Sequence, residues 1–262
     1  MKNLVRILLL SAMSLVSVIA NAQESVDLVF IGNSITYGAL HKDPSKTAPP
    51  VKCTEWIGSQ QGIGETHFLN MGKSGRTTFN FVPARTGIQN YWQELKAKTA
   101  QLVADHPADK LVFSIMLGTN DAAERPSNSR TTPSMYYHNM KLIVDSLLAL
   151  YPRAIIVLHR PIFFSAPFVT RNGSIQDKTS QKMLTVYYKE CVRLSKDYAK
   201  VNSGHVFTGD KDAYTFFKKN YHTMVNHEHG RDNCDFWLHP NEQGSAILAE
   251  YWGKAILKAL HR

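Results

Sequence analysis

The sequence predicts an α/β fold, a three-layer α/β/α sandwich around a central five-stranded parallel sheet. The first observation is that short apolar runs rich in large and β-branched residues alternate with longer segments whose apolar residues recur every three or four positions. Such strands, separated by helices, are typical of a parallel sheet covered on both faces. The second observation is that residues 23–262 contain no internal repeat and no low-complexity linker, which predicts a single domain.

Strands and helices are expected to alternate along the whole chain. The expected strands are 27–31, 67–70, 110–116, 154–158 and 205–207. The expected helices between and after them are 53–61, 90–105, 133–150, 174–199 and 241–260. Each helical segment has apolar residues at a spacing that places them on one face, as a helix packed against a sheet requires.

Residues 1–22 have the layout of a secretory signal peptide. Lys2 and Arg6 precede an apolar run of about 13 residues, and the small residues at 20–22 resemble a cleavage site. The run is shorter than the roughly 20 residues that a membrane-spanning helix needs. We therefore expect cleavage before Gln23 and a periplasmic or secreted protein, with an uncleaved anchor as the alternative.

Charge and cysteine content narrow the classes of partner. The formal net charge of +9 is scattered over the chain, and no nucleic-acid-binding motif accompanies it, so a basic surface is expected rather than a nucleic-acid partner. Cys53, Cys191 and Cys234 have no CxxC spacing, which gives no support to a structural zinc site. An oxidising compartment permits one disulfide among them, and the sequence does not say which pair forms it. No obligatory protein partner is evident.

Four polar clusters follow or flank the expected strands. They are "GNS" at 32–34, "MGKSGRTT" at 71–78, "LGTND" at 117–121 and "DFWLHPNEQG" at 235–244. Ligands of open parallel sheets bind at the carboxyl ends of the strands. We therefore expect these clusters to meet at one edge of the sheet and to form a site there.

The residue types in these clusters match the needs of acyl transfer. Ser34 follows the tight bend at Gly32, and a serine hydroxyl becomes a nucleophile when a base such as His239 takes its proton. Gly75, with its unobstructed backbone N–H, and Asn120, with its side-chain amide, are candidate donors to a developing oxyanion. Each residue alone is more simply a turn or cap residue. Their joint occurrence at one sheet edge favours an ester hydrolase.

The same blocks resemble those of the SGNH hydrolases, the GDSL-like esterase/lipase family. "FIGNSITYG" resembles the first block, with Asn33 where aspartate is commoner, and "NMGKSGRTT", "LGTND" and "LHPNEQG" resemble the next three in the family's order. The resemblance implies a flavodoxin-like fold with no metal and no organic cofactor. It also implies Ser34 as nucleophile, His239 as base, and an oxyanion hole formed by the Ser34 and Gly75 N–H groups and the Asn120 side chain.

One position departs from the family pattern. The family usually has an aspartate three residues before the histidine, and position 236 is a phenylalanine here. Asp235 is therefore the expected triad acid, reaching His239 through a bulged turn. A backbone carbonyl that orients the ring is the alternative, because the histidine needs an acceptor of some kind. Asp232 and Glu228 are poorer candidates.

Substrate choice is expected to lie in three long segments, 39–53, 160–176 and 210–237. The second and third carry aromatic residues beside arginine and histidine, a combination that suits sugar rings; packing within the loops is the alternative interpretation. These aromatics are Phe163, Phe164, Phe168, Tyr214, Phe216, Tyr221 and Trp237. The histidines at 222, 227 and 229 with Glu228 are too weak a pattern to predict a metal site.

We expect an exported carbohydrate esterase that removes small acyl groups, above all acetyl, from glycans. A lipid or thioester acyl hydrolase is the alternative within the same fold, and plant cell-wall polysaccharides and sialic-acid esters are both open as substrates. A catalytically inactive glycan-binding module is the alternative from another class, and the phenylalanine at 236 is its best argument.

Overall fold

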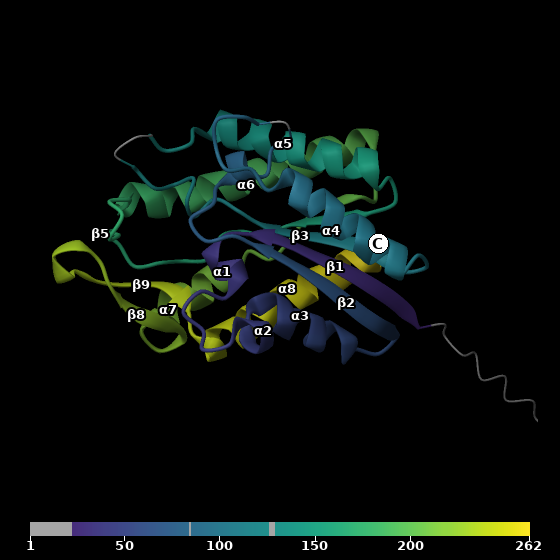
Figure 1. Cartoon of the computed structure of the whole chain (residues 1–262), viewed down its shortest axis with the longest axis horizontal. Helices are drawn as coiled ribbons and strands as arrows, with labels where there is room; N and C mark the ends of the chain where they lie inside the picture. The colour runs from purple at the N-terminus through teal and green to yellow at the C-terminus, as the bar shows by residue number, and fades with distance from the viewer. Residues whose placement is uncertain (1–22, 84, 126–128) are drawn as a thin grey trace, which may run out of the picture.

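The sheet lies between two layers of helices, as Figure 1 shows. The computed structural model describes residues 23–83, 85–125 and 129–262, so the predicted signal peptide lies outside the described residues. Five strands form the main sheet in the order β2-β1-β3-β4-β7, and every neighbouring pair is parallel. The predicted α/β fold with a central five-stranded parallel sheet is confirmed.

All of the predicted strands are present, and the first two are longer than expected. The strands of the main sheet are β1 (Glu24–Gly32), β2 (Ile63–Gly72), β3 (Lys110–Met116), β4 (Ile155–Leu158) and β7 (Val206–Thr208). The central strand β1 is buried from Val26 to Gly32, whereas the edge strand β2 is half-exposed over most of its length. Two-sided burial explains why β1 is a continuous apolar run that shows no alternation.

Helices cover both faces of the sheet. In Figure 1, α3 (Pro49–Gly58) and α8 (Glu242–Leu260) lie on one face, and α4 (Trp92–Asp105), α5 (Pro133–Leu150) and α6 (Lys178–Val201) lie on the other. Shorter elements are α1 (Ser34–Tyr37), α2 (Pro44–Thr47), α7 (Ala213–Met224) and the 3₁₀ turns Thr78–Asn80 and Arg231–Asn233. Within the described ranges, no helix combines the length and the apolar character that crossing a bilayer requires.

Local chemistry explains where the helices begin. Thr132 accepts a hydrogen bond from the Met135 N–H at 3.2 Å and so caps α5. Asp177 caps α6 by accepting from the Ser180 N–H at 2.8 Å, so this helix starts at Lys178, four residues after the predicted position 174. Helix α3 starts at Pro49, before the predicted position 53, because proline is well suited to the first helical turn.

The two long segments after β4 and β7 contain structure that the sequence did not predict. The first holds the two-stranded pair β5 (Phe168–Val169) and β6 (Ile175–Gln176). The second, predicted as a loop, holds α7 and the antiparallel hairpin of β8 (Val225–His229) and β9 (Asp235–Pro240). The hairpin escaped prediction because β8 is polar and half-exposed and so lacks an apolar pattern.

The three cysteines are free thiols, so the structure contains no disulfide between them. Cys53 and Cys191 are buried in helices, and burial raises the pKa of both thiols, that of Cys191 to about 12. Two protonated, buried thiols are small core residues here, and neither is suited to act as a nucleophile.

Candidate active site

Ser34 lies where β1 ends and α1 begins, at the carboxyl edge of the sheet. A Cβ atom at Gly32 would overlap the Thr36 hydroxyl and lie 3.1 Å from the Met116 carbonyl oxygen, so only glycine allows this close approach of strand and helix. Asn33 caps α1 by accepting a hydrogen bond from the Ile35 N–H at 3.0 Å. The Ser34 N–H is at the first helical position and has no partner within the helix.

His239 lies 205 residues further along the chain, and its Nε2 is 2.8 Å from Ser34 Oγ. The backbone around the histidine is fixed on both sides. Asn226 donates from Nδ2 to the carbonyls of His239 and Pro240, each at 3.1 Å, and Asn241 caps α8 by accepting from the Gly244 N–H. The predicted approach of Ser34 and His239 is therefore present.

Glu228 on β8 holds the other ring nitrogen of His239. Its Oε2 and Oε1 lie 2.9 and 3.0 Å from His239 Nδ1, and Oε1 also accepts the backbone N–H of His239 at 3.0 Å. An ionised carboxylate only accepts hydrogen bonds, so it fixes the proton on Nδ1 and leaves Nε2 free to accept from Ser34. Both side chains are largely buried, 14% exposed for His239 and 12% for Glu228.

The prediction that Asp235 orients His239 is wrong. Asp235 is 55% exposed, and its Oδ1 lies 2.9 Å from His227 Nε2 and 3.0 Å from His229 Nδ1. The hairpin register shifts between Val225 and His227, but Asp235 pairs with His229 at the other end of the hairpin, so this irregularity does not bring it to His239. Four residues of extended strand span about 13 Å. The alternative that a backbone carbonyl orients His239 is also wrong, because the carboxylate of Glu228 occupies the position beside Nδ1.

The hairpin register explains how Glu228 takes this place. Glu228 pairs with Phe236 across the hairpin, so the carboxylate comes from the strand opposite the position where the family usually has its aspartate. Phe236 is buried and stacks on Phe168 with ring centroids 4.1 Å apart. Glu228 could have been found from the sequence only by predicting that β8 and β9 form a hairpin, because their pairing is what places Glu228 near His239.

Gly75 and Asn120, the predicted oxyanion donors, line the same cavity as Ser34 and His239. Gly75 has φ of +74°, a left-handed conformation that favours glycine, and an added Cβ would meet no atom within 4 Å. Asn120 donates one amide hydrogen from Nδ2 to the Arg76 carbonyl at 3.0 Å. The amide has a second hydrogen, which meets no acceptor among the described residues.

Two further residues, which the sequence did not single out, join the loops that carry Gly75 and Asn120. Arg125 donates to the Gly75 and Asn120 carbonyls, at 3.3 and 3.2 Å. Asp121 accepts from the Thr78 N–H at 3.1 Å and from the Thr78 hydroxyl at 2.6 Å. Burial raises the pKa of Asp121 to about 6 and lowers the pKa of Arg125. These bonds fix the two donor loops relative to each other.

The cavity beside Ser34 has a volume of about 540 Å³ and a mainly polar wall. It is lined by Ser34, Ala39, Ser74, Gly75, Arg76, Asn120, Arg125, Thr170, Asn172, Ser174, Gln176, Leu238 and His239. None of the seven aromatics predicted to contact substrate is among these lining residues. Phe163, Phe164 and Phe168 are buried, so for them the structure supports the alternative of packing within the loops.

Comparison with known proteins decides the family. The sequence signature of the GDSL-like lipase/acylhydrolase family matches residues 30–247. The chain belongs to this family. The predicted family membership is thereby confirmed, and so is the prediction that the protein is a carboxylic ester hydrolase. No curated protein matches the chain.

Solved structures of GDSL-like enzymes share the fold at low sequence identity. A putative GDSL-like lipase from Parabacteroides merdae is 16% identical with a TM-score of 0.58, over 90% of this chain and 97% of its own. A catalytic mutant of Axe2, an acetylxylan esterase from Geobacillus stearothermophilus, is 17% identical with a TM-score of 0.54, over 91% and 96%. A two-domain esterase active on acetylated mannans is 17% identical with a TM-score of 0.50, over 92% of this chain and 51% of its own.

Proposed function

We propose that this GDSL-like enzyme is a serine esterase that hydrolyses small acyl esters, above all acetyl esters, on carbohydrates. The observation that carries the proposal is the contact of 2.8 Å between Ser34 Oγ and His239 Nε2, with Glu228 on Nδ1, at the wall of a polar cavity. A hydroxyl, an imidazole and an orienting carboxylate in this order form a catalytic triad.

In the proposed cycle, His239 removes the proton of Ser34 as the hydroxyl attacks the ester carbonyl. Glu228 stabilises the imidazolium that forms, and the Ser34 and Gly75 N–H groups with the free amide hydrogen of Asn120 stabilise the oxyanion. His239 then protonates the leaving alcohol. Water, activated by the same imidazole, attacks the acyl-serine and releases the acid.

The wall of the cavity favours a short acyl group on a polar alcohol. Ala39 and Leu238 are the only apolar side chains lining it, within the part of the chain that the structure describes. A long acyl chain needs continuous apolar surface to be removed from water, at about 25 cal/mol per Å². Hydrogen-bonding side chains such as Asn172, Gln176 and Arg125 suit the hydroxyl groups of a sugar. This wall argues against the lipid hydrolase alternative.

A second cavity gives room for neighbouring sugar units. Its volume is about 790 Å³, and it shares Ser74 and Arg76 with the cavity beside Ser34. Tyr37 and Phe68, 47% and 39% exposed, lie in its wall and offer apolar faces that sugar rings can stack on. The acetylxylan and acetylated-mannan activities named for two of the solved relatives agree with a glycan substrate.

Acetate release from acetylated xylan and mannan oligosaccharides, compared with hydrolysis of octanoyl esters, tests the proposal. We expect higher kcat/KM for the acetylated sugars and complete loss of turnover in Ser34→Ala with unchanged circular dichroism. A preference for the octanoyl ester would instead establish the lipid or thioester hydrolase. Binding of oligosaccharide by the wild type without any turnover would establish the glycan-binding module.

We also propose that the protein is exported, with residues 1–22 removed as a signal peptide. Amino-terminal sequencing of the protein recovered from its native host tests this, because cleavage leaves Gln23 as the first residue. Fractionation in the same experiment distinguishes a periplasmic from a secreted protein. An intact amino terminus in the membrane fraction would support the uncleaved anchor.

A further inference from the structure

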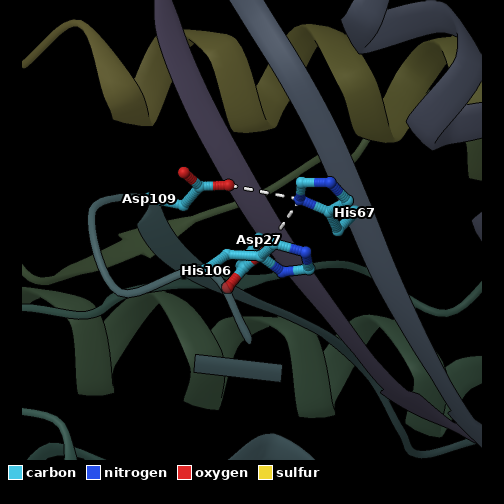
Figure 2. A group of neighbouring side chains, drawn as sticks. All are labelled: Asp27, His67, His106 and Asp109. Carbon is cyan, nitrogen blue, oxygen red and sulfur yellow. Dashed lines mark hydrogen bonds and ion pairs between the residues drawn. The ribbon is translucent and has the colours of Figure 1, made fainter. Parts of the chain in front are cut away.

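Two histidines and two aspartates meet at the edge of the sheet opposite the candidate active site (Figure 2). Asp27 lies near the start of β1 and pairs with His67 of β2 in the strand register. His106 follows the last residue of α4, and Asp109 directly precedes β3. Three segments of the chain thus contribute these side chains: β1, β2 and the loop between α4 and β3, which carries both His106 and Asp109. Asp27 is seven residues before Ser34 along an extended strand, roughly 20 Å away.

Asp27 is the buried member of this group and lacks hydrogen bonds. It is 1% exposed, and neither carboxylate oxygen has a hydrogen-bond partner among the described residues. Its Oδ1 lies within ion-pair distance of His67 Nδ1 and His106 Nδ1, but outside hydrogen-bonding geometry. Nδ1 of His106 is likewise buried without a partner in the described structure. A buried charge in this state is costly unless a cation or a set of donors compensates it.

The potential ligand atoms already have the spacing of a metal site. All of them lie within 4.8 Å of one another. His67 Nδ1 is 3.2 Å from Asp109 Oδ2 and 3.4 Å from Asp27 Oδ1, and His106 Nδ1 is 3.2 Å from Asp27 Oδ1. Four ligands at about 2.0–2.1 Å from a tetrahedral zinc ion are about 3.3 Å apart. Three of the measured separations therefore equal the edge of such a tetrahedron.

We propose that Asp27, His67, His106 and Asp109 bind one divalent transition-metal ion, with Zn²⁺ as the ion that fits the ligand set. Two imidazole nitrogens and two carboxylate oxygens are ligands that Zn²⁺ accepts in tetrahedral geometry, whereas Mg²⁺ and Ca²⁺ prefer oxygen ligands throughout. Two carboxylates and two neutral imidazoles together with Zn²⁺ also give a site with no net charge, which suits the burial of Asp27.

The stacking of the two rings argues against compensation of the carboxylates by two bound protons. His67 and His106 stack with centroids 3.4 Å apart and an interplanar angle of 3°. Two imidazolium cations in face-to-face contact would repel each other. Protonation of both histidines is therefore a poor way to balance the negative charge of the two carboxylates. Coordination requires each ring plane to contain the metal, so the rings swing apart when the ion enters. Their side chains, 28% and 27% exposed, have room for that movement.

The position of the site gives the metal a structural role. All four ligands come from the protein, which leaves no open coordination position for a substrate, as in structural zinc sites. The ion would connect β1, β2, the end of α4 and the start of β3 at the edge remote from Ser34. Metal binding should therefore raise stability and leave ester hydrolysis unchanged.

Calorimetric titration of the metal-stripped full chain with Zn²⁺ tests the site. We expect one ion per chain, binding at least about 100-fold weaker in His106→Ala, and an X-ray absorption spectrum with two nitrogen and two oxygen ligands at about 2.0–2.1 Å. The matched control is the double variant His227→Ala, His229→Ala, which removes the other cluster of potential ligands, with Asp235, on the exposed hairpin. This control should bind as the wild type does.

A thermal-unfolding series keeps the test decisive if His106→Ala folds poorly. Zn²⁺ should raise the Tm of the wild type and of the hairpin double variant, and leave that of Asp109→Asn unchanged; Mg²⁺ should shift none of them. Wild-type binding weaker than about 1 μM, or binding lost in the hairpin variant and kept in His106→Ala, overturns the proposal. Ser34→Ala should bind Zn²⁺ normally, so failure of the metal site and failure of the esterase assignment are separate outcomes.

Discussion

Glu228→Gln tests the most specific feature of the candidate triad. In the structure, Oε1 of Glu228 accepts the backbone N–H of His239 at 3.0 Å. A backbone N–H can only donate, so the glutamine must keep its oxygen at this position. Its amide nitrogen then takes the place of Oε2, 2.9 Å from Nδ1, and donates a hydrogen to that ring nitrogen. The proton of the imidazole is forced onto Nε2, where it can no longer accept from Ser34.

The size of the effect follows from this change of tautomer. The corresponding Asp-to-Asn substitution in the Ser-His-Asp triad of serine proteases lowers kcat by about 10⁴, which is about 5.5 kcal/mol in the activation barrier. Since Glu228 holds the ring through a side-chain and a backbone contact, we expect a loss of about 10³ to 10⁴ in kcat with a small change in KM. Asp235→Asn should keep activity within about threefold, because its carboxylate contacts exposed histidines and its loss removes a surface ion pair.

Saturation kinetics with p-nitrophenyl acetate measure both variants, and circular dichroism with thermal unfolding shows whether each one folds. Ser34→Ala gives the background rate. A folded Glu228→Gln enzyme that keeps more than a tenth of wild-type kcat would refute the role of Glu228. Equal losses in Glu228→Gln and Asp235→Asn would refute the separation of the two carboxylates.

Four other outcomes follow from single contacts. Asn120→Ala should lower kcat by about 10²–10³ in the same ester assay, because one oxyanion donor is lost; a change confined to KM would contradict that role. Gly32→Ala should destabilise the fold by about 1–3 kcal/mol in urea unfolding, because its Cβ overlaps the Thr36 hydroxyl, and a neutral effect would disprove the close approach. Tyr37→Ala should raise KM for acetylated oligosaccharides and leave p-nitrophenyl acetate hydrolysis unchanged; equal effects on both would argue against a sugar-binding role. Burial raises the pKa of Asp121 from 3.8 to about 6, so the stability associated with its protonated form is complete below pH 3.8 and is lost as the pH rises through 6. Asp121→Asn should match the wild type near pH 4 and exceed it by up to about 3 kcal/mol at pH 7 in urea unfolding, and identical pH profiles would contradict the raised pKa.

Local pattern was sufficient for most of the fold. The apolar run of β1 and the apolar face of α5 are both buried in the core. Their residue spacing in the sequence therefore predicted the strand and the helix correctly. The hairpin of β8 and β9 was missed, because its strands are stabilised by pairing with each other and its outer face is polar. Cross-strand pairing leaves little trace in a single strand's sequence.

The sequence by itself indicated the candidate nucleophile, base and oxyanion donors, because a glycine bend, a serine and a histidine before a helix cap are local features. Only the tertiary structure decided which carboxylate reaches His239, since that depends on the register between two strands and gives the place to Glu228. The same holds for the group of Asp27, His67, His106 and Asp109, whose members lie up to 82 positions apart in the numbering and meet only when three chain segments come together. Distances along the chain do not encode distances in space, which folding alone sets.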